Sequence, residues 1–221
     1  MIIHPKDSIF PDPSLSDEDG LLCIGGDLNT NTLIDSYYHG IFPWPQKGLP
    51  ILWFCPVKRG ILNFSKLHIP ARLKKFRKSW SGEFKINSAF RQVINACRLQ
   101  KRPGQSGTWI LPEMIKAYTD LHKAGYAHSV EAWENDRLVG GIYGVFVGNV
   151  FSGESMFYKK ANCSKLCLWR LVEHLQNIGL EWMDVQMLTP VTETFGGEYI
   201  TREEFLILLK REHEKEKIVF F

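Results

Sequence analysis

The sequence has no hydrophobic run long enough to cross a membrane. Its 221 residues contain no stretch of 18 or more consecutive apolar residues, roughly the shortest run that predicts a transmembrane helix. The N-terminus, which reads M-I-I-H-P-K-D, also lacks the charged and then apolar pattern of a secretory signal. A content of 44% hydrophobic and 23% charged residues is ordinary for a packed globular protein. We therefore expect a cytoplasmic protein with one large domain, or with one domain and a smaller companion.

Cysteine is too sparse and too irregularly spaced for a disulfide framework or a zinc site. The five cysteines, at positions 23, 55, 97, 163 and 167, are odd in number and include no C-x-x-C pair. Cys163 and Cys167 stand one helical turn apart, but no histidine or further cysteine completes a zinc-binding spacing. The pattern indicates a reducing compartment and a protein without a metal site.

Acidic residues are absent from positions 36–82. That stretch holds nine lysines and arginines, whereas positions 1–35 hold six aspartates, one glutamate and a single lysine. Within it, Pro70 to Trp80 has the periodicity of a helix with one apolar side. The rest of this helix carries five cations, which are Arg72, Lys74, Lys75, Arg77 and Lys78. Such a helix would present cations to a polyanion, although a basic face that is simply solvated is the alternative.

Periodicity predicts an α+β fold. The order is helices, then a three-strand meander, then a helix, a strand and a last helix, which argues against a doubly wound parallel sheet. The predicted helices run from Asn31 to His39, from Pro70 to Trp80, after Asn87 as N-cap, from Pro112 to Gly125, from Leu166 to Ile178, and from Thr201, which is spaced to form a capping box with Glu204. The predicted strands lie within positions 19–27 and at Ile51 to Cys55, His128 to Trp133, Leu138 to Val147, Val150 to Phe157 and Trp182 to Met187.

The predicted hairpin of Leu138 to Val147 and Val150 to Phe157 has two unusual features. It contains four glycines, at 140, 141, 144 and 148, which weaken strands unless a backbone or a ligand must approach closely. Glu154 lies among apolar neighbours in its second strand, where a carboxylate buried without a partner is costly. The hairpin is therefore either a plain structural element or part of a binding pocket.

Asp184 and Gln186 stand two residues apart on a predicted strand, so their side chains should point to one face. Asp184 could then accept a hydrogen bond from the Gln186 amide and turn the Gln186 carbonyl oxygen outward. That oxygen could orient an attacking amine by accepting a hydrogen bond from it. An N-terminal α-amine has a pKa of about 7.7–8.0, so a useful fraction is neutral at physiological pH. A plain surface pair is the alternative interpretation.

The order meander–helix–strand is that of GNAT-type acyltransferases, which hold the pyrophosphate of coenzyme A on a glycine-containing turn before a helix. The corresponding turn here, Tyr158 to Ser164, contains no glycine. Coenzyme A therefore fits poorly, although a CoA-dependent N-acyltransferase remains an enzymatic alternative. A non-enzymatic alternative is an RNA-binding module in which the hairpin glycines are structural.

Ten short segments follow one another in an order and with spacings that resemble the leucyl/phenylalanyl-tRNA–protein transferase family over about residues 8–210. These segments are Asp19 to Leu28, Gly40 to Trp44, Ile51 to Trp53, Thr108 to Ile110, Ala117 to Tyr118, Leu121 to His122, Ala127 to Glu131, Leu138 to Gly144, Phe151 to Phe157 and Asp184 to Gln186. The chain departs from the family at residues 53–59, which read W-F-C-P-V-K-R in place of the usual W-W-S-P-D-P-R. It departs again at Val191 and at Thr194 to Gly197, where the family usually has a histidine and S-L-G-A.

This resemblance implies an aminoacyltransferase. Members of the family transfer Leu, Phe or Met from aminoacyl-tRNA to the α-amino group of proteins with N-terminal Arg or Lys, which marks those proteins for degradation. The resemblance implies a small N-terminal α+β domain, expected at residues 1–62, and a GNAT-like domain, expected at residues 63–221, with a mostly antiparallel sheet flanked by helices. It also implies a monomer that needs no cofactor or metal and has no membrane partner.

The resemblance also assigns site residues. It implies that the catalytic residues are Glu154, Asp184 and Gln186, of which the last two would position the acceptor amine. It places the tRNA's terminal adenosine near Trp44 and Trp109. The residues expected around the amino-acid side chain are Tyr118, Phe151, Met156, Leu171 and Leu175, and those expected to bind tRNA are Arg72, Lys74, Lys75, Arg77 and Lys78. Three carboxylates, those of Glu131, Glu154 and Asp184, are candidates to bind the basic side chain of the acceptor.

Overall fold

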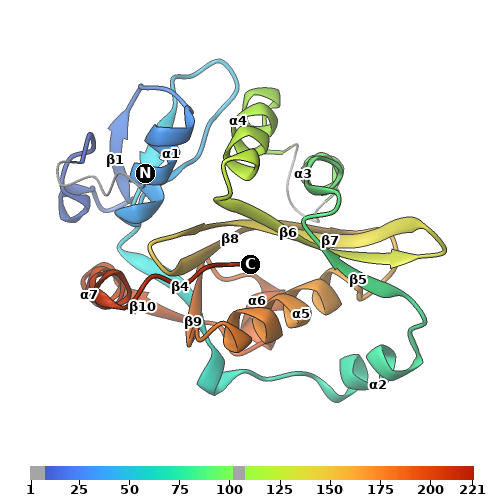
Figure 1. Ribbon diagram of the computed structural model, residues 1–221. Helices are drawn as coiled ribbons and strands as arrows, with labels where there is room; N and C mark the ends of the chain where they lie inside the picture. The colour runs from blue at the N-terminus through green and yellow to red at the C-terminus, as the bar shows by residue number, and fades with distance from the viewer. Residues whose placement is uncertain (1–7, 102–107) are drawn as a thin grey trace.

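The computed structural model describes residues 8–101 and 108–221, which form two β-sheets and their covering helices. A three-stranded sheet belongs to the N-terminal part of the chain, and a seven-stranded sheet belongs to the rest (Figure 1). The predicted α+β class, with a small N-terminal part before a sheet flanked by helices, is confirmed. Within the described ranges, no helix is long and apolar enough to span a membrane.

The small sheet has the strand order β1-β3-β2. Its strands are β1 (Leu21–Ile24), β2 (Phe42–Pro43) and β3 (Leu52–Phe54). Helix α1 (Thr30–Tyr38) follows Asn29, whose side-chain oxygen accepts a hydrogen bond from the Thr32 amide at 2.9 Å. This confirms the helix predicted from positions 31 to 39. Leu33 and Tyr37 on α1 are buried in an apolar cluster that also includes residues of the larger sheet, so the two sheets share a core.

The large sheet has the order β10-β4-β9-β8-β7-β6-β5 and is antiparallel except between β8 and β9. Its strands are β4 (Lys58–Asn63), β5 (Glu83–Ile86), β6 (Ala127–Glu134), β7 (Arg137–Val147), β8 (Val150–Tyr158), β9 (Trp182–Gln186) and β10 (Glu198–Thr201). Gly148 and Asn149 join β7 to β8 with φ of +58° and +63°, which suits a two-residue hairpin turn. The predicted meander of three strands is confirmed.

Helices cover both faces of the large sheet (Figure 1). The upper face in this view carries α3 (Phe90–Leu99) and α4 (Pro112–Lys123), and the lower face carries α5 (Cys163–Asn177) and α6 (Pro190–Thr194). Helix α2 (Ala71–Ser79) packs on α5, and α7 (Arg202–Glu214) lies against β10 and β4. Three apolar clusters result among the described residues: one with α1, α3 and α4, one with α2 and α5, and a smaller one with α7.

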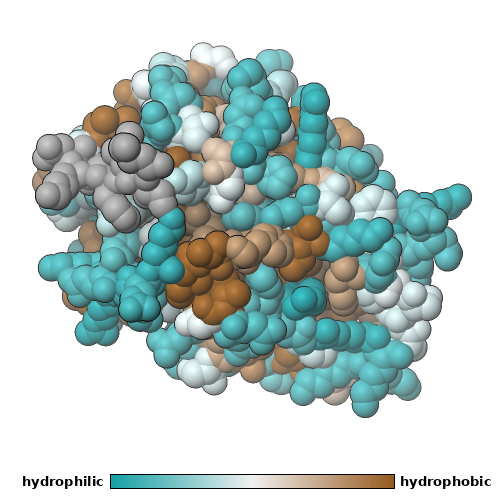
Figure 2. All heavy atoms as spheres, viewed as in Figure 1, coloured by the Kyte–Doolittle hydropathy of each residue, from teal (hydrophilic) through white to brown (hydrophobic). Residues whose placement is uncertain are grey.

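The C-terminal residues 216–221 return to the large sheet. The Phe220 side chain is buried, and its ring stacks on that of His128 with 3.8 Å between centroids. Val219 and Phe221 are exposed, and Figure 2 shows hydrophobic residues around this end of the chain on a face that is otherwise mostly hydrophilic. The Phe220 ring and hydrogen bonds between Asn149 and the backbone of Glu216 and Ile218 therefore hold the tail in place.

Three features differ from the sequence-based expectations. The sequence patterns did not predict the short elements β2, β4, β5, β10 and α6, because each lacks a clear periodicity. Asn87 does not cap α3, which begins after Ala89; Asn87 instead has φ of +59°, and its side chain bonds to His128 and to the Ser129 amide. Strand β4 pairs within the large sheet, and the domain boundary expected after residue 62 stays a prediction.

Removal of the Thr201 hydroxyl should destabilise the protein through the start of α7. Thr201 Oγ1 accepts from the Glu204 amide at 3.2 Å, and the Glu204 carboxylate accepts from the Thr201 amide at 2.8 Å, as the predicted capping box requires. We expect Thr201→Ala to lower the free energy of unfolding by about 1 kcal/mol, measured by chemical denaturation. Thr201→Ser keeps the hydroxyl and is the matched control, and equal stability of the Ala and Ser variants would contradict the capping role.

Candidate active site

A cavity of about 420 Å³ lies where β8 and β9 part. These parallel strands pair at a single position, between Ser152 and Asp184. The residues that follow on both strands, Gly153 to Met156 and Val185 to Gln186, line the cavity. The carboxyl ends of parallel strands are a common place for ligand binding, because the strand ends leave backbone and side chains pointing into one crevice. Further walls come from the segment after β2, from α5 and from the connection between β9 and α6.

Glu154 and Gln186 are in direct contact in this cavity. Gln186 Nε2 donates a hydrogen bond to Glu154 Oε1 at 2.7 Å, and the Tyr37 hydroxyl donates to the same oxygen at 2.7 Å. The Tyr118 hydroxyl lies 2.5 Å from that of Tyr37 and 3.4 Å from Glu154 Oε2. Donors from α1, α4 and β9 therefore converge on one carboxylate of β8.

This environment changes the protonation of Glu154. Burial raises the pKa of Glu154 to about 7, although hydrogen bonds from Tyr37 and Gln186 oppose the change. Burial also raises the pKa of Tyr37 and of Tyr118 well above the ordinary value, and the Glu154 carboxylate adds to this effect. Both tyrosines therefore stay protonated as hydrogen-bond donors, while Glu154 titrates near neutral pH.

Asp184 lies behind the cavity in a buried ion pair with Arg59 of β4. Arg59 Nε donates to Asp184 Oδ1 at 2.8 Å, and Arg59 Nη2 donates to Asp184 Oδ2 at 2.7 Å. The Ser152 hydroxyl donates to Oδ2 at 3.0 Å, and the backbone amide of Gln186 donates to Oδ1 at 2.8 Å. Four donors thus satisfy the carboxylate. The two parallel hydrogen bonds from one guanidinium make this ion pair strong and fix its geometry.

The rest of the Arg59 side chain is enclosed by aromatic rings. Its Cζ lies 4.7 Å from the centroid of the Phe42 ring and 4.4 Å from that of Phe205. Burial lowers the pKa of Arg59, but the Asp184 carboxylate more than offsets this, so the pKa is raised overall and the guanidinium stays charged. Aromatic faces and the two-point ion pair together reduce the cost of burying both charges.

Gln186 occupies a strained position at the end of β9. The register of β4 against β9 shifts between Gly60 and Ile61, and Gln186 has φ of +59°, which costs on the order of 1–3 kcal/mol for a non-glycine residue. A Cβ at position 60 would lie 3.1 Å from the Leu188 amide nitrogen and 3.3 Å from the Gln186 carbonyl oxygen. Gly60 therefore lets the irregular end of β9 approach β4.

The irregular strand end changes which carboxylate contacts the Gln186 side chain. The sequence predicted regular alternation and a hydrogen bond from the Gln186 side chain to Asp184. In the structure the side-chain amide donates to Glu154, and Asp184 accepts from the Gln186 backbone amide. Asp184 thus holds the backbone of Gln186, and Glu154 holds its side chain.

The structure brings some of the expected substrate-binding residues to the cavity and leaves others in the core. Trp44 and Trp109 both line the cavity, with 6.4 Å between ring centroids, and Met156 lines it as well. Tyr118 lies behind Glu154 as its hydrogen-bond partner. Three others are buried in the apolar cluster behind the wall: Phe151, Leu171 and Leu175.

Two residues of this site, Tyr37 and Arg59, were not recognised in the sequence. Tyr37 lies 117 residues before Glu154, and Arg59 lies 125 residues before its partner Asp184. Arg59 stands in the acid-free segment, where it looked like one more surface cation. One signal was available, because Arg59 keeps the final arginine of the W-W-S-P-D-P-R segment from which residues 53–59 otherwise depart.

Helix α2 exposes four of the five predicted tRNA-binding cations. Arg77 is the exception, since its guanidinium bonds to Glu173 at 2.5 and 2.9 Å and lies 4.2 Å from the centroid of the Trp169 ring. Leu73 is buried beside this contact. The exposed cations are Arg72, Lys74, Lys75 and Lys78. Arg77 therefore anchors α2 to α5, and the other four point to solvent.

Comparison with known proteins relates the whole chain to one family. The model of a family described as leucyl/phenylalanyl-tRNA protein transferase matches residues 61–210, and the model of that family's N-terminal domain matches residues 26–57. A leucyl/phenylalanyl-tRNA–protein transferase of Anaeromyxobacter sp. (strain K) is 44% identical over 211 residues, which are 96% of this chain and 91% of the relative. The enzyme of the same name from Desulfatibacillum aliphaticivorans is 47% identical over 200 residues, or 90% of this chain and 86% of the relative.

Solved structures give a weaker likeness. The C-terminal domain of a putative lysylphosphatidylglycerol synthetase from Agrobacterium fabrum is 8% identical, with a TM-score of 0.45, over 80% of this chain and 67% of that chain. A likeness at this level carries no conclusion about this protein.

Replacing Glu154 by Gln should remove a pH-dependent part of the stability. The pKa of Glu154 rises from 4.5 to about 7 on folding, so between these values the folded state binds more protons than the unfolded state. The stabilising effect of the protonated group is therefore complete below about pH 4.5 and is lost as the pH rises through about 7. We expect the free energy of unfolding of wild type, relative to Glu154→Gln, to fall between about pH 5 and 7.5. Chemical denaturation across this range measures the difference, and a difference that is constant with pH would contradict the raised pKa.

Proposed function

The chain belongs to the leucyl/phenylalanyl-tRNA–protein transferase family, and we propose that it carries out aminoacyl transfer in the cavity between β8 and β9. Its activity is the transfer of Leu or Phe, and also Met, from aminoacyl-tRNA to the α-amino group of proteins with N-terminal Arg or Lys, which marks them for degradation. The observation that supports this location most directly is the contact between Glu154 and Gln186 at 2.7 Å, inside a cavity that Trp44 and Trp109 also line.

The reaction replaces an ester bond by an amide bond. The lone pair of the neutral α-amine attacks the carbonyl carbon of the aminoacyl ester and forms the new C–N bond. The C–O bond to the terminal ribose then breaks, and a proton from the amine passes to the ribose oxygen, so that tRNA leaves with a free hydroxyl. No oxidant, reductant or further group is needed, because the ester is already activated.

Gln186 is the residue that orients the amine in this proposal. With its Nε2 engaged by Glu154 at 2.7 Å, its Oε1 is the atom that can accept a hydrogen bond from the attacking amine. Glu154 fixes the side chain, and Asp184 fixes the backbone amide of the same residue. Arg59 acts one step further away, since it holds Asp184. Gln186 is thus the contact with substrate, and Asp184 and Arg59 are positioning residues.

The donor fits the apolar part of the cavity. Trp44 and Trp109 provide flat faces for the terminal adenosine. The wall that receives the amino-acid side chain is apolar and is formed by Ile142, Met156, Leu168 and Met183. Such a wall favours Leu, Phe and Met over polar residues, with roughly 1–3 kcal/mol of selectivity for each methylene. Three residues pack behind this wall and would affect donor binding by setting the shape of the wall: Phe151, Leu171 and Leu175.

The acceptor's basic side chain needs a carboxylate that reaches the cavity. Asp184 is taken by Arg59. Glu131 is buried on β6, where it accepts from the hydroxyls of Ser88 and Ser129. Of the three expected candidates, Glu154 is the one that lines the cavity. We therefore assign the attraction for N-terminal Arg or Lys to Glu154, whose negative charge grows as the pH rises through about 7.

The family and the basic surface of α2 indicate how the enzyme binds tRNA and where it acts. The four exposed cations of α2 suit a sequence-independent contact with tRNA phosphates, and such contacts weaken as salt rises. All five cysteines are free, which agrees with a reducing, cytoplasmic setting. That the enzyme acts as a monomer without cofactor or metal stays part of the proposal.

Gln186→Ala should abolish most of the transfer and leave tRNA binding intact. The variant removes the group that orients the amine, and misplacement of one reactant costs on the order of 100-fold in rate. The assay follows labelled leucine from leucyl-tRNA into peptides that begin with Arg, Lys or Ala, with tRNA affinity measured separately. Leucine should enter the Arg and Lys peptides and not the Ala peptide. Near wild-type turnover by Gln186→Ala would remove Gln186 from the mechanism.

The effect of the buried ion pair on catalysis can be separated from its effect on stability. Arg59→Met leaves Asp184 buried and unpaired and should lower the free energy of unfolding by about 3–5 kcal/mol. The double variant Arg59→Met with Asp184→Leu removes the stranded charge and should regain much of that stability. Its kcat should nevertheless stay about 100-fold below wild type, with an unchanged KM for leucyl-tRNA, because the Gln186 backbone amide has lost its acceptor. A double variant that regains both stability and kcat would show that the pair serves folding alone.

A further inference from the structure

A groove lies between α3 and the end of β8, away from the contacts that the reaction uses. It has a volume of about 930 Å³. On one side it is lined by Arg91, Asn95 and Lys101 from α3 and the residues after it, and on the other by Tyr158 and Lys159 from the end of β8. We call it the α3 groove.

The charge of the α3 groove has a single sign. Three cations line it, Arg91, Lys101 and Lys159, and no acidic residue does. Within the described part of the chain none of these three forms an ion pair, whereas the neighbouring Lys160 bonds to Glu134 at 2.6 Å. Three uncompensated cations around one depression raise the local positive potential more than the same charges scattered over the surface would.

The polar and aromatic residues that line the groove suit a nucleic acid better than a simple anion, beside an apolar floor of Ala96, Leu99 and Phe157. Gln92 and Asn95 supply side-chain amides from α3, and Tyr158 exposes 52% of its surface. Cations and amides bind phosphate and sugar oxygens, and an exposed aromatic ring offers a face on which a base can stack.

The α3 groove and the reaction cavity are lined by successive residues of β8 and its end. Residues Gly153 to Met156 of β8 line the cavity, and Phe157 to Lys159 line the groove. At roughly 3.3 Å per residue, Lys159 lies roughly 16 Å along the chain from Glu154. An RNA strand whose esterified end occupies the cavity therefore has a basic depression within the reach of its last few nucleotides.

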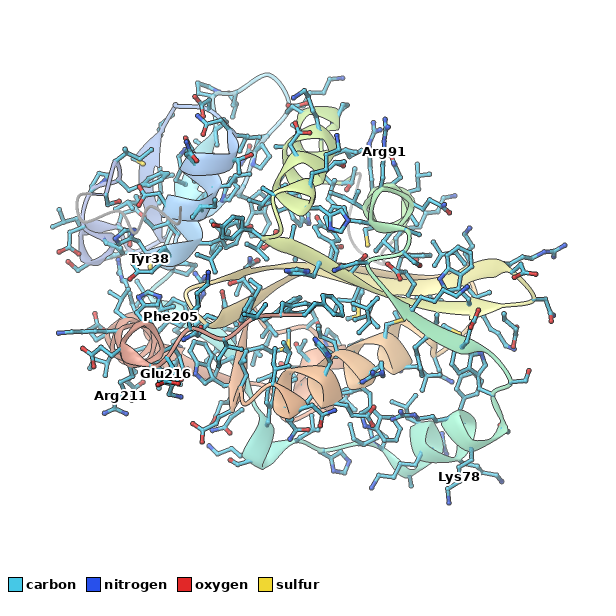
Figure 3. All side chains as sticks on the ribbon, viewed as in Figure 1. Tyr38, Lys78, Arg91, Phe205, Arg211 and Glu216 are labelled. Atoms are coloured by element: carbon cyan, nitrogen blue, oxygen red, sulfur yellow. The ribbon has the colours of Figure 1, made fainter. Side chains whose placement is uncertain are left out.

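The α3 groove is separate from the basic helix α2. In Figure 3 Arg91 projects from α3 above the sheet, and Lys78 projects from α2 below it. The sheet and helix α5 lie between these two helices (Figure 1). The two basic surfaces therefore contact different parts of any RNA that reaches both, and their contributions to binding should be independent.

We propose that the α3 groove binds the phosphate backbone of the donor tRNA next to its aminoacylated end, as a second RNA contact besides α2. The proposal rests on the proposed function for the identity of the RNA. The groove holds the strand that leaves the cavity, and α2 holds a more distant part of the same molecule. Loss of groove contacts should therefore weaken tRNA binding and leave the chemical step unchanged.

The first test compares two charge-reversed proteins. The groove variant is Arg91→Glu with Lys159→Glu. The control variant is Lys210→Glu with Arg211→Glu, which makes the same charge change at two exposed positions on α7, on the opposite side of the molecule (Figure 3). We expect the groove variant to raise the Kd for leucyl-tRNA at least about tenfold at moderate salt. We also expect the slope of log Kd against log salt to fall by about 1.4–1.8, as the loss of two phosphate contacts predicts. The control should change both quantities much less.

The second test uses a donor too small to reach the groove. Leucine esterified to adenosine alone occupies the cavity without extending along β8, so its transfer rate should differ less than about twofold between wild type and the groove variant. The neutral variant Arg91→Gln with Lys159→Gln also loses both phosphate contacts, so its salt slope should fall by a similar amount, while its Kd should rise less because no repulsive charge is added.

Three results would overturn the proposal. One is a groove variant that binds leucyl-tRNA with the wild-type Kd and salt slope. Another is an equal loss of rate with leucyl-tRNA and with leucyl-adenosine, because the effect would then act through the cavity. The third is a rise in the KM of the acceptor protein in place of the tRNA, which would assign the groove to an acidic segment of the acceptor. Failure of wild type to transfer leucine would instead contradict the proposed function, and the binding measurement does not depend on that activity.

Discussion

The ion pair of Arg59 and Asp184 is the constraint on which the site depends. It joins β4 to β9 at the point where β9 leaves the sheet. Because two buried charges need exact mutual placement, the pair fixes the two strands more tightly than apolar packing alone would. The strained backbone of Gln186 persists because Asp184 also accepts its amide. The backbone of Gln186 is therefore held from behind the cavity by Asp184 and Arg59.

Glu154 joins three other elements of the fold through hydrogen bonds. Its carboxylate receives hydrogen bonds from Tyr37 on α1, Tyr118 on α4 and Gln186 on β9. The N-terminal part of the chain thus contributes directly to the cavity, which explains why α1 shares a core with the large sheet. Because burial raises the pKa of this carboxyl to about 7, the charge of the cavity changes near neutral pH.

The distribution of charge separates binding from chemistry. Inside the fold, Arg59 and Asp184 neutralise each other, and Glu154 is satisfied by neutral donors. Outside, the four exposed cations of α2 and the three of the α3 groove remain without acidic partners in the described ranges. Long-range attraction for a polyanion therefore comes from the surface, where solvent limits its cost, and selectivity comes from an apolar cavity whose polar groups are already oriented.

Local patterns were enough to predict the β7–β8 hairpin, the amphipathic α2 and the capping box of α7, because each depends on residues only a few positions apart. The sequence by itself thus determined the α+β class, the family, and Glu154 and Gln186 as candidates. Only the tertiary structure decided that Arg59 pairs with Asp184, that Tyr37 binds Glu154, and that Arg77 anchors a helix to Glu173. These partners lie 125, 117 and 96 residues apart, and no periodicity reports which distant charge a buried charge will meet. Strand order and packing decide which charged groups meet. A charge buried without a partner would destabilise the fold.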